Sequence, residues 1–149
     1  MSSPCRLVGY VTVREFAGFR LPVPVQNLVL RSYAQGLDTP YALPQCEHKY
    51  PGSYMQLFTT LRDVELGDHV GMCSAAMLPP LGELRDEALS IVSEKQLTLH
   101  LVFERIVAGS ENDVRRFEDA ERIASEVRRA DGLSVASALK SFLADGRPA

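Results

Sequence analysis

The stretch RLVGYVTVREFAGFRLPVPVQNLVLRSYAQ, residues 6–35, decides the fold of this chain. Its first part, Arg6–Val13, is rich in valine and leucine and predicts a strand. Its last part, Val25–Gln35, has apolar residues at helical spacing and predicts a helix, with Gly36 just past the end. Between them lies the polar loop Arg14–Pro24. Ligands of open α/β sheets bind outside the carboxyl ends of the strands, so this loop is the first candidate for a site.

Strands and helices continue to alternate after this unit. Further strands are predicted at Tyr41–Gln45, His69–Ala75 and Thr98–Phe103, and further helices at Tyr54–Val64, from Pro79 to about Glu94, and from Ser110 to about Ala130. Cys46–Gly52 is predicted to be a polar loop, and Ser53 the N-cap of the helix after it. The alternation predicts one α/β domain over residues 1–149, with helices on both faces of a parallel sheet in three layers, flavodoxin-like or resolvase-like. A long helix closes the core of about residues 6–130, and 131–149 form a short helix and a loose tail.

The composition argues against several classes of protein. The formal net charge of -3 and the pI of about 5.6 do not favour a nucleic-acid binder, which usually presents a basic face. No apolar run approaches the roughly 18 residues that span a bilayer. The opening MSSPCR lacks the apolar core of a signal peptide, so a cytoplasmic protein is expected. Three cysteines without C-x-x-C spacing predict free thiols.

Two arginines in the first loop are the leading candidates for a site. Arg14 and Arg20 would make a fork for a phosphate or carboxylate, because guanidinium groups bind such anions through paired hydrogen bonds. The helix that follows would add its positive end, and Phe19 lies between the arginines as a further substrate contact. The alternative is that the arginines form structural salt bridges with acidic residues such as Glu15, Glu47 or Glu104.

Polar residues at the start of the first helix extend this candidate site. Gln26 and Asn27 could bind sugar hydroxyl groups, although residues at these positions can equally cap the helix. Arg31 is one turn further and could reach the same opening, or could be a solvated surface residue. Tyr54, at the start of the second helix, could form a wall of a polar pocket or pack on the surface.

Glu104 follows the carboxyl end of one predicted strand, and Ser74 lies at the end of another. Glu104 is a candidate general base, or the partner that holds an arginine in place. Ser74 is expected to supply a hydrogen bond more readily than to act as a nucleophile, because no histidine lies nearby in sequence to activate it. His48 belongs to no zinc-binding pattern, and no metal is expected. His69 and His100 lie within predicted strands and are read as core or edge residues.

The spacing of GYVTV, Gln26, PGSYMQL, LGDHVGM and LTLHLVFERI resembles the catalytic domain of serine recombinases, the resolvase/invertase fold. The resemblance covers about Leu7–Ile106, and it implies that fold and a homodimer formed through the long helix. The chemistry departs from the pattern. Thr12 and Arg14 stand where the recombinases have an arginine and a serine nucleophile, and SAAMLPP lacks the arginines that follow the third strand. The resemblance therefore predicts the fold without strand exchange.

A second and closer resemblance is to sporadic carbohydrate cluster proteins. It is carried by GYVTVREFAGFRLPVPVQNLVLRSY, by SYMQL, by a serine and Leu-Pro after the third strand, and by Phe-Glu after the fourth. It covers most of the chain to about Ile123. Because the family is named for carbohydrate biosynthesis clusters, the resemblance implies a pathway and not a reaction.

Three functions follow as hypotheses. The first is a small enzyme of carbohydrate biosynthesis, a cofactor-independent isomerase or lyase that acts on a phosphorylated or carboxylated sugar-like molecule. Arg14, Glu104 and Ser74 would be catalytic, and Arg20, Gln26, Asn27, Arg31, Tyr54 and Phe19 would bind substrate. The second is a metabolite-binding or accessory protein that uses the same pocket. The third, a DNA recombinase, is disfavoured, and no partnership with nucleic acid or membrane is expected.

Overall fold

The computed structural model describes residues 5–16, 18, 20–50, 52–109 and 119. The chain forms two compact units, Met1–Val114 and Arg115–Ala149, and the description below is of the first. Apart from Asp119, the helices predicted at 110–130 and 133–143 lie outside the described residues, and the single domain over 1–149 stays a prediction.

A five-stranded sheet, in the order β3-β1-β5-β6-β7, forms the centre of this unit. Its strands are β1 (Leu7–Gly9), β3 (Tyr41–Ala42), β5 (His69–Met72), β6 (Thr98–Leu101) and β7 (Ile106–Ala108). All neighbouring strands are parallel except β7, which pairs antiparallel with β6. The short strands β2 (Val11–Thr12) and β4 (Cys46–Glu47) form a separate parallel pair. The alternating pattern therefore gives the predicted, mostly parallel α/β sheet.

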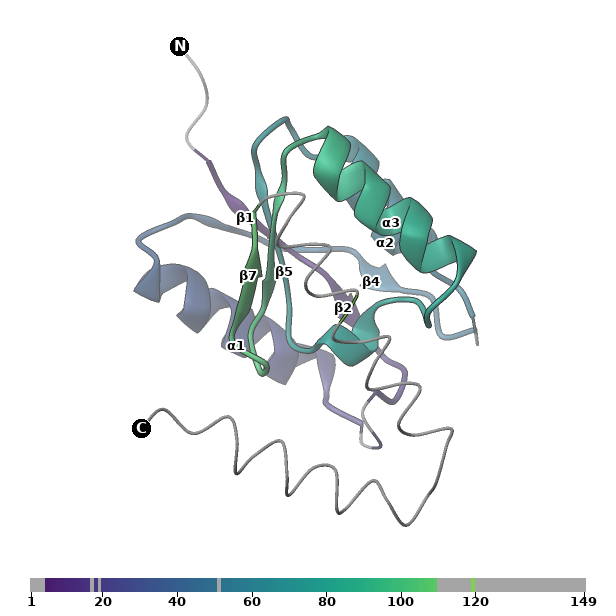
Figure 1. The fold of residues 1–149 in the computed structure, drawn as a ribbon. Helices are drawn as coiled ribbons and strands as arrows, with labels where there is room; N and C mark the ends of the chain where they lie inside the picture. Colours follow the sequence, from purple (N-terminus) through teal and green to yellow (C-terminus); the bar gives the residue numbers. More distant parts are fainter. Residues whose placement is uncertain (1–4, 17, 19, 51, 110–118, 120–149) are drawn as a thin grey trace, which may run out of the picture. The chain divides into compact units, whose positions relative to one another are not determined.

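The helices cover both faces of the sheet. They are α1 (Val23–Gly36), α2 (Met55–Asp63), α3 (Glu83–Glu94) and the one-turn 3₁₀ helix η1 (Ala75–Met77). In Figure 1, α1 lies on one face, and α2 and α3 lie together on the other. The predicted fold class, a layered α/β domain, is thus confirmed. Across the residues that the structure describes, no helix combines the length and apolar character needed to cross a bilayer.

Two glycines let α1 approach the central strands. A Cβ atom on Gly9 would lie 3.1 Å from Cδ1 of Leu30, and one on Gly71 would lie 3.4 Å from Cδ2 of the same leucine. Leu30 is fully buried between them. Close packing of this kind fills the space that missing side chains leave, so the core of this face centres on Leu30.

The structure corrects several predicted element boundaries. The first strand is interrupted at Tyr10, which separates β1 from β2. The predicted polar loop Cys46–Gly52 begins with β4, because its backbone pairs with β2. The strand predicted at Thr98–Phe103 ends at Leu101, where a turn leads into the unpredicted β7. Helix α1 begins two residues before the predicted Val25, because proline is tolerated in the first turn of a helix.

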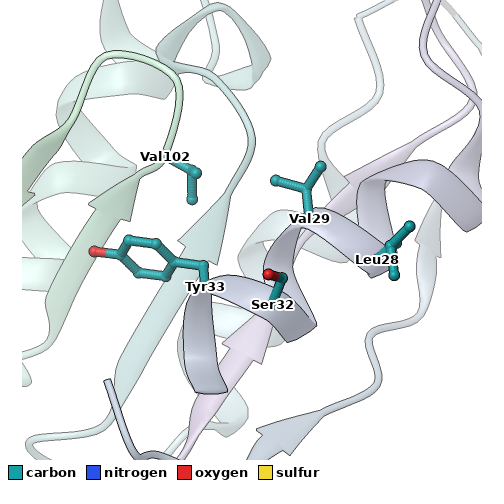
Figure 2. A pocket seen from close by; sticks show the side chains of 5 residues that line it. All are labelled: Leu28, Val29, Ser32, Tyr33 and Val102. Carbon is teal, nitrogen blue, oxygen red and sulfur yellow. The ribbon is translucent and has the colours of Figure 1, made fainter. Parts of the chain in front are cut away.

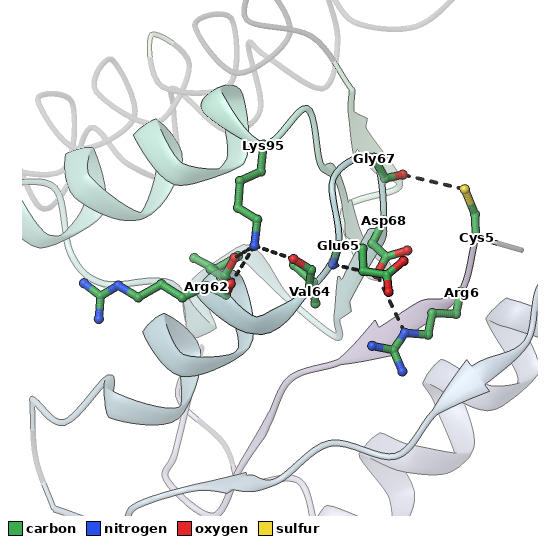
Figure 3. Close-up of polar contacts among 9 residues, drawn as sticks. Cys5, Arg6, Arg62, Val64, Glu65, Gly67, Asp68 and Lys95 are labelled. Carbon is green, nitrogen blue, oxygen red and sulfur yellow. Dashed lines mark hydrogen bonds and ion pairs between the residues drawn. The ribbon is translucent and has the colours of Figure 1, made fainter. Parts of the chain in front are cut away.

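The carboxyl end of α2 is held by a lysine from the end of α3 (Figure 3). Nζ of Lys95 donates hydrogen bonds to the carbonyl oxygens of Leu61 at 2.9 Å and Arg62 at 2.7 Å, and also to that of Val64. The last carbonyl groups of a helix have no partner within the helix, so a cation there both satisfies them and opposes the helix dipole. Lys95 therefore joins α2 to α3.

Candidate functional site

A buried carboxylate occupies the amino end of α2. Glu47 of β4 is 2% exposed. Its oxygens accept hydrogen bonds from the backbone N–H groups of Gln56 at 3.1 and 3.2 Å and of Leu57 at 3.1 Å. The prediction of Ser53 as the N-cap is wrong, because the cap residue is Tyr54, whose side chain makes no capping hydrogen bond. The hydroxyl group of Ser53 instead lies 3.4 Å from Glu47 Oε1. The positive end of this helix is therefore already bound to a carboxylate of the chain itself.

Tyr10 links this carboxylate to the interrupted first strand. Its hydroxyl group donates a 2.9 Å hydrogen bond to Glu47 Oε2. Burial, with a further contribution from the charge of Glu47, raises the pKa of Tyr10 well above its ordinary value, and the charge of Arg14 opposes this shift. The phenol thus stays protonated and serves as a donor.

Arg14 is held in place by two neighbours. Its guanidinium carbon lies 4.6 Å from the centre of the Tyr54 ring, and its Nε donates to the hydroxyl group of Thr12 at 3.3 Å. The backbone N–H of Arg14 donates to the same hydroxyl at 3.1 Å. A cation over a tyrosine ring is stabilised by about 0.5–1 kcal/mol at an exposed site. Arg14 and Tyr54 therefore lie in direct contact.

The convergence of Arg14 with Arg20 is not seen. Arg20 is exposed, and the described residues contain no contact that joins the two arginines. Their alternative salt bridges are not seen either, since the ion pairs found in the described residues are Arg6–Asp68 and Arg62–Glu87. Phe19 lies outside the described residues.

Gln26 has a structural position that differs from the predicted one. It is fully buried. Its amide nitrogen donates 2.7 Å hydrogen bonds to the carbonyl oxygens of Thr12 and Leu21, and its amide oxygen accepts from Thr12 N at 3.1 Å. The side-chain amide of Gln26 therefore bonds the backbone of β2 at Thr12 in the way that a neighbouring strand would. A ligand would have to break these bonds, so we do not retain Gln26 as a binding residue.

Asn27 and Arg31 meet at Tyr41. The hydroxyl group of Tyr41 donates to Asn27 Oδ1 at 2.7 Å, and the guanidinium carbon of Arg31 lies 6.0 Å from the centre of the Tyr41 ring. Burial raises the pKa of Tyr41 to about 12. The negative charge of an ionised Cys73 thiolate shifts this pKa in the same direction. Sequence reasoning missed Tyr41 because a tyrosine at the start of a strand carries no local signal of this contact.

Ser74 and Glu104 both bind η1. The Ser74 hydroxyl accepts from Ala76 N at 3.1 Å, and the Glu104 carboxylate accepts from Ala75 N at 2.6 and 3.2 Å. Ser74 is buried, whereas Glu104 is exposed. Burial, assisted by the charge of Glu104, raises the pKa of the neighbouring Cys73 thiol to about 11. These two predicted catalytic residues thus lie near one another, but each already has a structural partner.

A pocket of about 430 Å³ opens between α1 and the residue that follows β6 (Figure 2). It is lined by Leu28, Val29, Ser32, Tyr33 and Val102. None of these was predicted as a site residue, because the α1 residues read as part of an ordinary amphipathic helix. Among the described residues, no group of three or more potential metal-binding side chains is found.

Comparison with known proteins supports the fold. No protein-family model matches the chain, and no curated protein matches it. Among solved structures, the chain is similar to the N-terminal catalytic domain of TP901-1 integrase, with a TM-score of 0.58 and 17% sequence identity. The match covers 83% of this chain and 96% of that one. At this identity the likeness concerns the fold alone, and it confirms the resolvase-like architecture predicted from the sequence.

Proposed function

We propose that this chain binds an anionic, hydroxyl-bearing small molecule beside Arg14 and acts as a metabolite-binding or accessory protein. The observation that carries the proposal is the fixed guanidinium group of Arg14. The Tyr54 ring and the Thr12 hydroxyl hold it, while its two terminal nitrogens have no hydrogen-bond partner within the described residues. A preoriented guanidinium edge suits a phosphate or carboxylate group.

Binding fits better than catalysis because the polar groups near the carboxyl ends of the strands already have partners. Ser74 caps η1, Glu104 binds its first N–H group, and Glu47 binds the start of α2. Groups that are used in this way are poor candidates for moving protons in a substrate. A phosphorylated or carboxylated sugar is the ligand class that we propose, on the strength of the carbohydrate-cluster resemblance in the sequence.

A cofactor-independent isomerase or lyase is the second candidate. One observation favours it: Glu104 is exposed, and its hydrogen bonds go to a single backbone N–H group, that of Ala75. Such a carboxylate keeps capacity to accept a proton. We do not propose strand exchange, because the buried hydroxyl group of Thr12 accepts hydrogen bonds from Arg14 and is 2% exposed, and Arg14 stands where the recombinases have their nucleophile.

The test is a thermal-shift screen of sugar phosphates and sugar acids against the full chain and two arginine variants. Arg14→Ala should lose the stabilisation that a ligand gives. Arg62→Ala is the matched control, because Arg62 also stacks on a ring, that of Phe58 at 5.3 Å, at the other end of α2. Equal stabilisation of the Arg14 variant would refute the site. Turnover of a stabilising ligand that Glu104→Gln abolishes would favour the enzyme.

A further inference from the structure

The ring of Tyr41 joins two polar residues of α1. Its hydroxyl group donates a 2.7 Å hydrogen bond to Oδ1 of Asn27, and the guanidinium carbon of Arg31 lies 6.0 Å from the ring centre. Asn27 and Tyr41 are half-buried, and Arg31 is exposed. Asn27 and Arg31 are four residues apart in a helix, so they are neighbours on the same helix face. The three side chains therefore form one cluster between α1 and β3.

The pairing of β3 with β1 brings the Tyr41 ring to α1. Tyr41 lies opposite Leu7 in this parallel pairing. Its ring extends toward Gly9, where a Cβ atom would lie 2.5 Å from the Tyr41 hydroxyl oxygen. Because the glycine leaves this space open, the hydroxyl group can reach Asn27. The position of the Asn27 amide group is thus set by the sheet as well as by its own helix.

The hydrogen bond also fixes which way the Asn27 amide group faces. Within the described residues, the Tyr41 hydroxyl group has no acceptor other than Oδ1 of Asn27, so its proton is directed to that oxygen. The amide nitrogen, Nδ2, is then turned away from the phenol, and no hydrogen bond from it is found within the same residues. Because no buried side-chain nitrogen in the described part of the chain lacks a partner, Nδ2 is open to the solvent.

Arg31 adds charged donors beside this amide group. Side chains of a helix lean toward its amino end, which brings Arg31 toward the turn that holds Asn27. The ion pairs found in the described residues do not include Arg31. The sequence of α1, VPVQNLVLRSYAQG, contains no acidic residue that could neutralise it. Nδ2 and the guanidinium group therefore present hydrogen-bond donors only, together with one positive charge.

We propose that Asn27 and Arg31 form a binding site for the phosphate or carboxylate group of a small molecule, and that Tyr41 is the residue that positions them. The oxygen atoms of such a group accept hydrogen bonds and carry negative charge, which matches a site made of donors and one cation. The guanidinium group binds two of the oxygens through its paired N–H groups. Nδ2 of Asn27 donates a further hydrogen bond to the same group.

This site is separate from the one proposed at Arg14. Arg14 is held by Thr12 and Tyr54. Within the residues that the structure describes, no hydrogen bond or ring contact joins Arg14 to Asn27 or Arg31. Neither proposal depends on the other.

The test is a titration of the full chain with inorganic phosphate and, separately, with acetate, at constant ionic strength in a chloride background. Two-dimensional heteronuclear NMR follows the side-chain amide signal of Asn27 and the Nε signal of Arg31. Both signals should shift with one common affinity. A response to phosphate, to acetate or to both identifies the group that the site accepts. The absence of a response to both anions would overturn the proposal.

Two substitutions separate anion binding from the anchoring of Tyr41. In Asn27→Asp, the carboxylate still accepts the Tyr41 hydrogen bond, but it offers no donor and repels an anion. The affinity measured at Arg31 should therefore fall by about tenfold or more. Arg31→Gln should abolish the shift of the Asn27 signal, and Arg31→Lys should restore only part of it, because lysine keeps the charge without the paired donors. An Asn27→Asp protein that binds as tightly as the unaltered chain would contradict the site.

Tyr41→Phe tests the positioning role. Without the phenol, the Asn27 amide group is free to turn, so the anion affinity should fall although both donors remain. Unchanged affinity would show that Tyr41 positions neither group. Arg14→Ala separates the two proposed sites and should leave the shifts of Asn27 and Arg31 as they are. Loss of these shifts in Arg14→Ala would mean that one site binds the anion, and it would overturn the second site while supporting the first.

Discussion

The phenol of Tyr10 donates a 2.9 Å hydrogen bond to the carboxylate of Glu47, and both side chains are almost completely excluded from solvent. This contact joins the point where the first strand is interrupted to the start of α2. We expect Tyr10→Phe to lower the free energy of unfolding by about 2 kcal/mol, since it removes a bond to a buried charge. Urea unfolding monitored by circular dichroism measures the change. Tyr50→Phe, at an exposed tyrosine, is the control and should leave the unfolding midpoint in place.

Replacement of Glu47 should be at least as costly. Glu47→Gln keeps the shape but turns one acceptor oxygen into a donor group that faces the N–H groups of α2, so about 2–3 kcal/mol of stability should be lost. Glu65→Gln, at an exposed glutamate, should change stability by less than about 0.5 kcal/mol. A Glu47→Gln protein as stable as the control variant would show that the carboxylate does not stabilise the helix.

Buried His100 predicts a loss of stability in acid. Burial and the nearby His69 lower its pKa from the usual 6.5 to about 4, so the unfolded chain binds a proton at a higher pH than the folded chain does. Stability should therefore fall as the pH decreases from 6.5 to about 4. The pKa difference corresponds to about 3 kcal/mol as an upper value. Urea unfolding at a series of pH values tests this, and the slope should diminish in His100→Asn but persist in His48→Gln.

Gly9 makes room for the ring of Tyr41. A Cβ atom on Gly9 would lie 2.5 Å from the Tyr41 hydroxyl oxygen. Gly9→Ala should therefore destabilise the protein by about 1–3 kcal/mol, as overpacking in a core does. Because the clash is with the oxygen, the same substitution should cost less in a Tyr41→Phe background, and a double-mutant cycle measures the difference. Strictly additive effects would contradict this explanation.

Lys95→Met should loosen the end of α2. The variant keeps the length of the side chain but removes the charge that binds three carbonyl groups, and we expect a loss of about 1–2 kcal/mol. Lys49→Met, at an exposed lysine, is the matched control. Hydrogen exchange should accelerate in α2 of the Lys95 variant before it does so in the central strands.

The sequence was sufficient for the central strands and not for the short pairings. β5 and β6 were predicted because His69–Met72 and Thr98–Leu101 lie within apolar runs that only a covered sheet can bury. β2 and β4 have two residues each, so their pairing depends on partners distant in sequence. The same reason explains the polar residues: Glu47 and Gln26 look available in sequence, yet the fold brings each to unpaired backbone groups that only the assembled structure reveals.

The hydrogen bonds from Lys95 to the end of α2 bear on the order in which the protein folds during synthesis. The carbonyl group of Val64 and the ammonium group that binds it are 31 residues apart in the sequence. We expect a nascent chain that is released or cleaved before Lys95 to have a frayed end of α2, because among the described residues before α3 no other side chain is seen to donate to those oxygens. The end of α2 therefore gains this stabilising contact only after α3 and Lys95 have been synthesised.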